Sequence, residues 1–258
     1  MTFTRFLSLV DIQARMSLRA DASRFFLGYI WWFLEPLLFV LIFYFIFDIV
    51  LESGRSDFLL FLICGNLPFM WFASSVSSSA LSILVSKGLV GQIDIPKAIF
   101  PMAKIQEGLY KQAAVFLLLI AIVVSSGVAP SLHWLWLFPL IVTEYLIIVT
   151  CSLVGAMLVC FAKDFTLLIS LTITFLMFVS GVFWDVRTLP NPEFTELFLL
   201  VNPLAFLFDG FRQVLLYNQP LDVAHLARLL VVCLVAAALV LGTMSRLDRV
   251  IATRVLAE

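Results

Sequence analysis

Six long apolar stretches cover most of this chain, and they constrain its fold more than any other feature. Each approaches or exceeds the roughly 20 residues that a helix needs to cross a hydrocarbon core about 30 Å thick. Inside that core the backbone must satisfy its own hydrogen bonds, so the stretches are predicted to be helices. The predicted spans are residues 30–50, 58–80, 112–129, 134–161, 165–184 and 226–244. The fold class is therefore predicted to be all-α: a polytopic membrane protein with six transmembrane helices.

The composition leaves no room for a separate soluble domain. Hydrophobic residues make up 63% and charged residues 13% of the 258 positions, and the mean hydropathy is +1.11. A soluble domain has about 45–50% apolar and about 25% charged residues. We therefore predict a single transmembrane domain over residues 1–258.

Positive charge is distributed unevenly between the two sides of the predicted membrane. Twelve of the 16 Lys and Arg residues lie before span one, between spans two and three, between spans four and five, or after span six. These segments share one side, and positive residues favour the cytoplasmic side. Both termini are therefore predicted to be cytoplasmic, which agrees with an even number of spans.

The sequence lacks the motifs of the common enzyme classes. No Lys follows a Gly, so the phosphate-binding loop G-x-x-x-x-G-K-[ST] does not occur. With two His residues, and no H-E-x-x-H or G-x-S-x-G, neither a metal site nor a Ser–His mechanism is supported. The basic residues follow one membrane side rather than a groove for nucleic acid. We expect a transport subunit with no catalytic residue, no metal, no cofactor of its own and no nucleic-acid partner.

Residues 2–26 are predicted to form an amphipathic helix rather than a span. Apolar residues recur there at helical spacing, while Asp11, Arg15 and Arg19 form a separate polar line. Such a helix suits the membrane interface. The plainer interpretation, a surface helix, also leaves it close to the membrane.

Aromatic residues open span one. Tyr29, Trp31 and Trp32 are interpreted either as an interfacial belt or as a rim on which sugar rings stack. Glu35 follows in or near the apolar region, where an ionisable residue is costly and by default functional. These four residues are candidates for the lining of a passage.

Two later spans carry further polar candidates. Ser75 and Ser78 belong to a serine cluster in span two, which either lets helices pack closely or lines a hydroxyl-rich passage. Glu144 lies near the middle of span four and is either a packed polar residue or part of a substrate route.

Residues 86–111 form the main loop on the side of the termini. The loop mixes basic residues with apolar ones that look exposed, and Pro96 and Pro101 predict short helices joined by bends. The apolar residues are Ile93, Ile95, Ile99 and Phe100. They are interpreted either as packing against this chain's own spans or as docking onto a second protein.

The longest segment on the other side covers about residues 185–225. Its apolar part is broken at Asn202-Pro203, and each half is too short to span. A pair of short helices dipping into the outer leaflet is predicted, since irregular backbone at that depth needs protein or water around it. The functional interpretation is an external lid over a passage.

Several of these segments, in this order, resemble the membrane subunit of type-2 ABC exporters, in particular bacterial polysaccharide exporters. The resemblance runs nearly end to end. It rests on the amphipathic start and on several short motifs. These are Leu27-Gly28-Tyr29-Ile30-Trp31, Leu34-Glu35-Pro36, Ile95-Pro96-Lys97-Ala98-Ile99-Phe100-Pro101, Lys163-Asp164, Ser180-Gly181-Val182-Phe183, Leu189-Pro190, Val201-Asn202-Pro203-Leu204 and Phe211-Arg212.

The resemblance implies partners and roles. Two copies would form the pathway, and two separate ATPase subunits, which bind ATP and Mg, would dock below. Residues 86–104 would hold the coupling helix and 185–218 the periplasmic gate helices. Tyr29, Trp31 and Trp32 would lie near the cytoplasmic entrance of the passage. The coupling residues would be Ile93, Asp94, Ile95, Pro96, Lys97, Ile99 and Phe100, and the gate residues Trp184, Asn202, Pro203, Asp209 and Arg212.

The implied cargo is a lipid-linked surface polysaccharide, such as O-antigen or capsule, crossing the bacterial inner membrane. Arg15, Arg19 and Arg24 could then attract the phosphates of the lipid, although the same charges satisfy the positive-inside rule. The alternatives are a type-2 permease for another cargo, such as teichoic acid or a drug, a secondary transporter, or a membrane-embedded glycan enzyme. A secondary transporter would show inverted repeats and paired charges along its spans, and neither is visible in the sequence.

Overall fold

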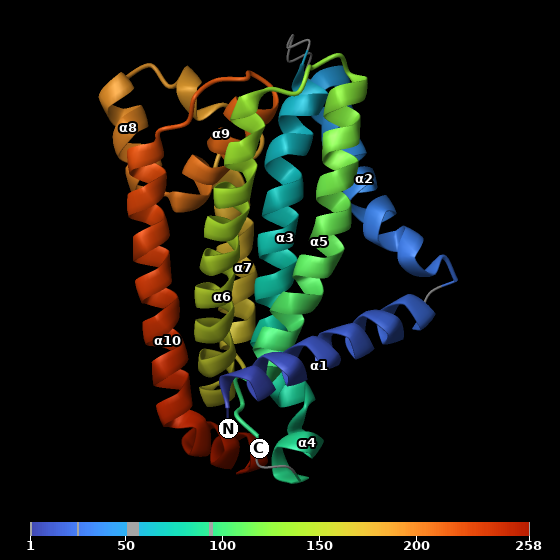
Figure 1. The fold of residues 1–258 in the computed structure, drawn as a ribbon, viewed down its shortest axis with the longest axis vertical. Helices are drawn as coiled ribbons and strands as arrows, with labels where there is room; N and C mark the ends of the chain where they lie inside the picture. Colours follow the sequence, from blue (N-terminus) through green and yellow to red (C-terminus); the bar gives the residue numbers. More distant parts are fainter. Residues whose placement is uncertain (1, 25, 51–56, 93–94, 258) are drawn as a thin grey trace.

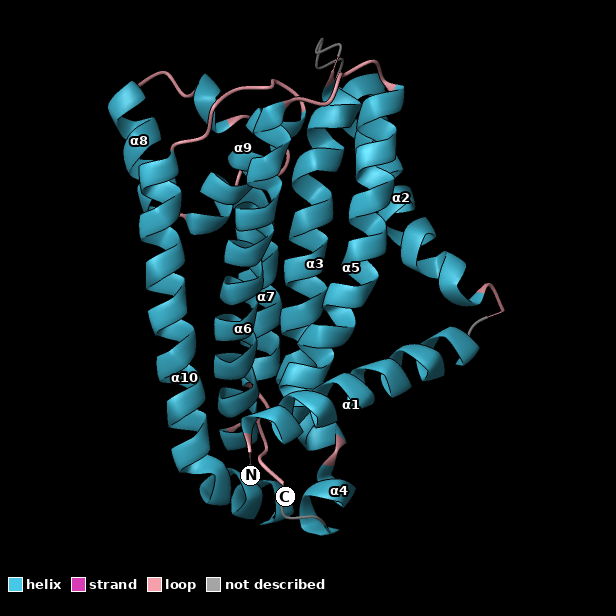
Figure 2. Cartoon of the chain, in the orientation of Figure 1, coloured by secondary structure: helices cyan, strands magenta, loops and turns pink. Residues whose placement is uncertain are grey.

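The computed structural model describes residues 2–24, 26–50, 57–92 and 95–257, and within these ranges it holds helices and connecting segments but no strand (Figures 1 and 2). The predicted all-α class is confirmed. The long helices are α1 (Phe3–Arg24), α3 (Phe58–Val85), α5 (Ile99–Ser125), α6 (Leu137–Phe161) and α10 (Val223–Ala257). The shorter elements are η1 (Gly28–Ile30), α2 (Trp31–Tyr44), η2 (Phe45–Val50), α4 (Lys87–Gln92), η3 (Leu132–Trp136), α7 (Phe165–Val179), η4 (Val186–Thr188), α8 (Pro192–Val201) and α9 (Pro203–Leu215).

Among the described residues, between four and six helices or bent helix pairs are long and apolar enough to cross a membrane. By length and apolarity α3, α5, α6 together with η3, and α10 can each cross a bilayer, and two bent helix pairs bring the number to six. The span predicted over residues 30–50 forms as α2, which a π-helical turn, η2, continues to Val50. All six predicted spans are therefore helical, although not all are long enough to cross a bilayer unaided.

The fifth predicted span is shorter than expected. α7 ends at Val179 after 15 residues, which at about 1.5 Å per residue reaches only about 22 Å. Gly181 then adopts φ +69°, and a Cβ at this position would lie 2.7 Å from the Val186 side chain. The chain therefore turns back at Gly181, and Val182 and Phe183 are buried against the bundle rather than extending the helix.

α3 lies at the centre of the bundle. It packs against α2, α5, α6, α7 and α9, while α10 packs along α6 (Figure 1). Its side chains Phe61, Leu62, Leu67 and Trp71 are at most 2% exposed. Close packing of these large apolar side chains holds the bundle together, since lipid supplies no hydrophobic drive between helices.

Both termini lie at one end of the bundle, which we call the terminal end (Figure 1). α1 crosses this end obliquely and packs on α5, and α4 lies there with the last turns of α10 (Figure 1). At the opposite end, the far end, α8 and α9 form a bent pair. The same-side placement of the termini agrees with an even number of crossings.

The bent pair α8–α9 has a local cause in the sequence. The two helices meet at 110°, and both begin with a Pro at their first position. Asn191 Oδ1 accepts a hydrogen bond from Glu193 N at 3.0 Å, and Asn202 Oδ1 accepts one from Ala205 N at 3.1 Å. A capping Asn before a Pro starts a new helix, so the break predicted at Asn202 is confirmed.

Candidate functional site

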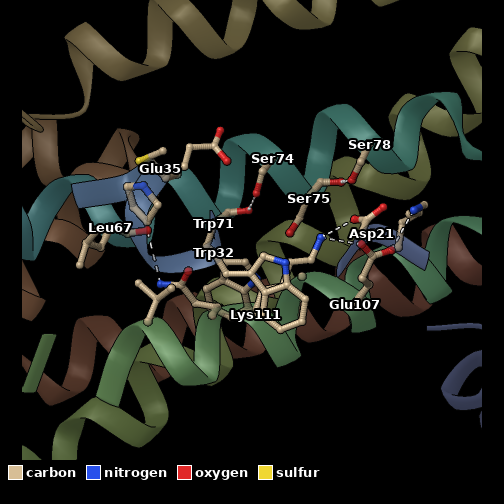
Figure 3. Close-up of a pocket in the computed structure, with 16 residues that line it drawn as sticks. Asp21, Trp32, Glu35, Leu67, Trp71, Ser74, Ser75, Ser78, Glu107 and Lys111 are labelled. Carbon is tan, nitrogen blue, oxygen red and sulfur yellow. Dashed lines mark hydrogen bonds and ion pairs between the residues drawn. The ribbon is translucent and has the colours of Figure 1, made fainter. Parts of the chain in front are cut away.

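A polar cavity lies near the terminal end, among α1, α2, α3 and α5. Its volume is about 260 Å³, and it brings together Trp32, Glu35, Ser75 and Ser78, which are four of the seven predicted pathway residues (Figure 3). The serines come from one face of α3, while Trp32 and Glu35 come from the first turns of α2. The remaining three pathway residues lie outside it.

An ion-pair network forms part of the lining of this cavity. Lys111 Nζ lies 2.8 Å from Asp21 Oδ2 and 2.7 Å from Glu107 Oε1 (Figure 3). Lys104 Nζ lies 2.8 Å from Glu107 Oε2 and donates to Ser17 Oγ at 3.0 Å. Since Asp21 and Ser17 belong to α1, the network fastens this helix to α5.

The network also sets the protonation of Asp21. Burial raises the pKa of this carboxyl, but the hydrogen bond from Lys111 and the positive charges of Lys111 and Lys104 help to outweigh burial and leave the pKa below its ordinary value. Asp11, ten residues earlier on α1, has its pKa lowered by hydrogen bonds from Tyr110 and Arg15. Both carboxylates are therefore charged at neutral pH and hold α1 against α5.

Two polar atoms in the cavity wall have no partner among the described residues. Trp71 Nε1 and Ser75 Oγ are buried without a hydrogen bond, although Trp71 and Ser75 both line the cavity. A Cβ on Gly108 would lie 2.5 Å from Ser75 Oγ and 3.5 Å from Trp71 Nε1. Leaving a buried polar atom unpaired costs about 1–3 kcal/mol, so a group that pairs with these two atoms would stabilise this wall.

The neighbouring serines differ from Ser75. Ser74 Oγ donates to Trp71 O at 3.3 Å, and Ser78 Oγ donates to Ser75 O at 3.3 Å. Both hydroxyls are thus satisfied by the backbone of their own helix. Of Ser74, Ser75 and Ser78, only Ser75 has a hydroxyl without a hydrogen bond to the described residues.

The other predicted entrance residues lie beside the cavity. Tyr29 is 53% exposed and its ring meets that of Trp32 edge to face at 4.8 Å. Trp31 is half-buried in the first turn of α2. Arg19 and Tyr29 line a separate shallow groove with Phe26. The cavity therefore accounts for only part of the predicted aromatic rim.

The remaining basic candidates on α1 differ in their surroundings. Arg15 pairs with Asp11 at 2.9 Å, so its charge is already partly balanced. Arg24 is the last residue of α1, and its side chain is outside the described residues.

Glu144 lies apart from the cavity. It is fully buried in α6, and neither carboxyl oxygen has a hydrogen-bond partner among the described residues. Tyr145, the next residue, stacks on Trp71 with ring centroids 6.4 Å apart. Glu144 therefore lies close to the α3–α6 contact, without forming part of the polar cavity.

The described apolar residues of the loop agree with the first of the two interpretations, packing against this chain, and are not exposed as they look in the sequence. Ile99 and Phe100 are 2% and 3% exposed, because α5 begins at Ile99 and its first turn already packs within the bundle. Lys97 is also buried, whereas Ile95 and Pro96 are half-buried. Ile93 and Asp94 lie outside the described residues. The apolar residues of this loop thus pack mainly against their own chain.

The exposed surface of the loop region is α4. Lys87, Leu89 and Gln92 are exposed there, and Leu89 keeps 42% of its surface accessible. The last turns of α10 pack against the other side of α4, where a Cβ on Gly91 would lie 3.0 Å from Leu256. A partner at the terminal end would therefore meet α4 before the buried residues Ile99 and Phe100.

At the far end Arg212 connects three segments. It is 2% exposed and donates to the backbone oxygens of Phe61 at 3.1 Å, Gly181 at 2.7 Å and Val182 at 2.8 Å. A Cβ on Gly65 would lie 2.2 Å from the guanidinium, so this position has room only for glycine. Arg212 thus fixes α9 to α3 and to the turn after α7.

The other predicted gate residues surround this contact. Asp209 accepts two hydrogen bonds from Arg187 Nε and one from Nη2, the last at 2.9 Å. Asn202 exchanges hydrogen bonds with Ser180, and Trp184 Nε1 donates to Phe178 O at 2.8 Å. Pro203 begins α9. The five residues are therefore brought to one end of the bundle, and their role as a gate stays a prediction.

Comparison with known proteins identifies the family. The model of the ABC-2 type transporter family matches residues 15–216, which include the cavity, the loop and the bent pair. The chain belongs to the ABC-2 type transporter family. It is 30% identical over 189 residues to the O-antigen export system permease protein RfbA of Klebsiella pneumoniae, covering 72% of each chain.

Two further relatives are more distant. An O-antigen export system permease protein RfbA of Myxococcus xanthus is 27% identical over 226 residues, which is 87% of this chain and 85% of the relative. The polysialic acid transport protein KpsM of Escherichia coli is 26% identical over 206 residues, covering 77% of this chain and 78% of the relative. The ABC-2 membership therefore rests on most of the chain.

Several residues of this ABC-2 cavity escaped the sequence analysis. Lys104, Glu107 and Lys111 follow one another at spacings of three and four, which places them on one helix face. That spacing could have predicted a cluster of charges on one face of this helix. No such pattern marks Asp21 and Gly108, since the side chains next to them come from other helices.

Proposed function

We propose that this ABC-2 chain is the permease subunit of an exporter that moves a surface polysaccharide across the bacterial inner membrane. The observation that carries the proposal is the similarity to relatives whose names specify O-antigen export or polysialic acid transport, over 72–87% of this chain. The polymer is carried on a lipid, and this chain provides the path rather than the energy.

The permease acts as a pair with a second copy of itself. α2 and α7 support this, since both expose large apolar side chains on the outside of the bundle. None of the 15 residues of α7 is buried in the single chain. An apolar face of this extent is suited to a partner helix as well as to lipid.

Two separate ATP-binding cassette subunits supply ATP hydrolysis and carry the ATP and Mg. The sequence supports this because it has no phosphate-binding loop. The exposed residues of α4 and the end of α10 are the proposed contact surface. When the ATPase subunits close, they push α4, and the attached helices move as rigid bodies.

Both termini face the cytoplasm, where these ATPase subunits reside. The placement of the termini at one end and the excess of Lys and Arg on that side support this orientation. The polar cavity then lies on the cytoplasmic side, where a lipid-linked polymer enters. Arg19, in the groove beside Tyr29, is better placed than Arg15 to attract the lipid phosphates, since Arg15 already pairs with Asp11.

Co-expression with a separately encoded ATP-binding cassette subunit tests the proposal. We expect a complex with two copies of each chain, ATP hydrolysis that changes when the permease is present, and restored polymer export in a strain lacking its own permease. Leu89→Asp on α4 should weaken the complex, whereas Leu132→Asp, at an exposed position of the far end, should not. A permease that forms no complex and restores no export contradicts the proposal.

A further inference from the structure

We infer that the polar cavity among α1, α2, α3 and α5 is a binding site for one uncharged sugar ring of the cargo, and not for its phosphate. The inference rests on the proposed function for its role in export. Its physical basis is the set of groups that line the cavity (Figure 3).

The charges in the lining disfavour an anion. Three carboxylates, from Asp21, Glu35 and Glu107, face two ammonium groups, from Lys104 and Lys111, so the net charge is −1. Both ammonium groups are already paired, at 2.7–2.8 Å. A phosphate would have to break these pairs and then meet the released carboxylates, which repel it.

An acyl chain is equally unsuited to this cavity. Trp71 Nε1 and Ser75 Oγ have no partner in the described part of the chain, and an apolar ligand would leave both unpaired. A metal ion is not indicated either, because no group of three or more His, Cys, Asp or Glu among the described residues could hold one.

A neutral ring with several hydroxyl groups can form hydrogen bonds with the polar groups of the lining that have no partner. An indole N–H can only donate, a serine hydroxyl both donates and accepts, and a carboxylate only accepts. Sugar hydroxyls can complement all three, at Trp71, Ser75 and the exposed carboxylate of Glu35. Trp32 adds an apolar wall for the C–H groups. Because the Ser75 hydroxyl is buried in the free chain, the inference requires its side chain to rotate toward the ligand.

The size of the cavity limits the ligand to a small group. Pockets for drug-sized molecules measure about 300–1,000 Å³, and this cavity, at about 260 Å³, lies just below that range. It therefore suits a single ring of the polymer rather than a long segment.

Glycoside binding to the purified full-length chain in lipid nanodiscs tests this inference. The probes are the methyl glycosides of glucose, galactose, mannose and N-acetylglucosamine, with inorganic pyrophosphate as the anionic alternative, followed by saturation-transfer NMR. We expect at least one glycoside to bind saturably and not to be displaced by pyrophosphate. Absence of binding by all four, or displacement by pyrophosphate, would overturn the inference.

Matched variants locate the site. Ser75→Ala removes the unused hydroxyl and should weaken glycoside binding by about fivefold to tenfold, the effect of one hydrogen bond. Gly108→Ala places a methyl group against the same hydroxyl and should act similarly. Ser125→Ala on α5 is the control, since Ser125 lies outside the cavity and its hydroxyl is bonded within its own helix. Equal losses in Ser75→Ala and Ser125→Ala would contradict the assignment.

This binding assay is separate from the test of the proposed function. It requires neither an ATPase subunit nor export. A permease that assembles with its ATPase and exports polymer, but binds no glycoside, refutes only the sugar site. A permease that binds the glycoside in the wild type, but forms no complex, refutes the proposed function. Thermal unfolding of each variant identifies those that fail to fold, and Gly108→Ala and Ser75→Ala provide independent tests.

Discussion

Asp248, near the end of α10, accepts a hydrogen bond from the backbone N–H of Lys97 at 2.6 Å. The same carboxylate lies 3.8 Å from Lys97 Nζ, and that ammonium group donates to Ile95 O at 2.8 Å. Lys97 is the second residue before α5. The contact therefore links the last turns of α10 directly to the start of α5 and to the loop after α4.

We predict that Asp248→Ala loosens this link. The variant removes a charged acceptor from the buried Lys97, which costs about 1.5–3 kcal/mol for such a bond. The chain should still insert and bind its ATPase partner, but less polymer should be exported per ATP hydrolysed. The measurement is the ratio of export to ATP hydrolysis in proteoliposomes.

Two variants control for nonspecific effects. Asp248→Asn keeps an acceptor for the Lys97 N–H and should retain most of the coupling. Arg228→Ala changes an exposed residue in the first turns of α10, away from the proposed ATPase contact, and should have no effect. If Arg228→Ala reduces the ratio as much as Asp248→Ala, the link has no special role.

A second prediction concerns the fit between Arg212 and Gly65. Gly65→Ala places a methyl group 2.2 Å from the guanidinium, and Arg212→Ala leaves three carbonyl oxygens without their charged donor. Each change should destabilise the docking of α9 by roughly 3 kcal/mol or more. The measurement is thermal unfolding of the detergent-solubilised protein.

The exposed Arg228 on α10 gives the matched comparison for this site. Arg228→Ala should leave the unfolding temperature nearly unchanged. The double variant Gly65→Ala with Arg212→Ala should be less destabilised than the sum of the two single variants, because both act on one contact. Simple additivity would show that Gly65 and Arg212 do not act together.

The sequence was sufficient to predict most of the fold. Long apolar runs predict the helices. Asn202-Pro203 predicts the bend between α8 and α9, because Asn caps a helix and Pro is favoured at its first position. The early end of α7 was not predicted. The helix ends there because Gly181 turns the chain at positive φ. Apolar residues on both sides of this glycine make the segment look like a continuous span in the sequence.

The site was only partly predictable, because it depends on which helix faces which. Trp32, Glu35, Ser75 and Ser78 were chosen by residue type, and they do line one cavity. The burial of Ile99 and Phe100 could not be decided from the sequence, since an apolar residue in a loop gives no indication of whether its own bundle covers it. Asp21 and Lys111, which pair between α1 and α5, are 90 residues apart in the sequence. No local sequence pattern therefore predicts their contact.

A third prediction follows from the lowered pKa values of Asp11 and Asp21 on α1. A carboxylate whose pKa is lowered in the folded state contributes stability above its ordinary pKa, and this is lost as the pH falls through the lowered value. With an ordinary value of 3.8, the docking of α1 on α5 should be unchanged from neutral to mildly acidic pH and should weaken only below about that value.

The mobility of a nitroxide label at Met16→Cys, an exposed position on α1, would report this docking. In Asp21→Asn the label should be more mobile at neutral pH, and its dependence on acid should shrink. A label whose mobility rises already between pH 7 and pH 5 would mean that another group controls the docking.

The last prediction addresses Glu144, which the sequence left between a packing role and a place on the substrate route. Its carboxyl group is fully buried and unpartnered among the described residues, so it destabilises the fold. Replacing it by Leu, with similar volume and no polar atoms, should stabilise the protein by about 1–3 kcal/mol, the usual penalty for such a group. Thermal unfolding and polymer export should be measured on the same preparation.

Raised stability with normal export would assign Glu144 to packing. Raised stability with export lost would indicate that the carboxyl is retained for transport, since a group that costs stability persists where function requires it. Lowered stability would contradict the absence of a partner, and Glu144→Gln, which keeps the shape and hydrogen-bonding capacity, would then identify whether a neighbour donates to this side chain.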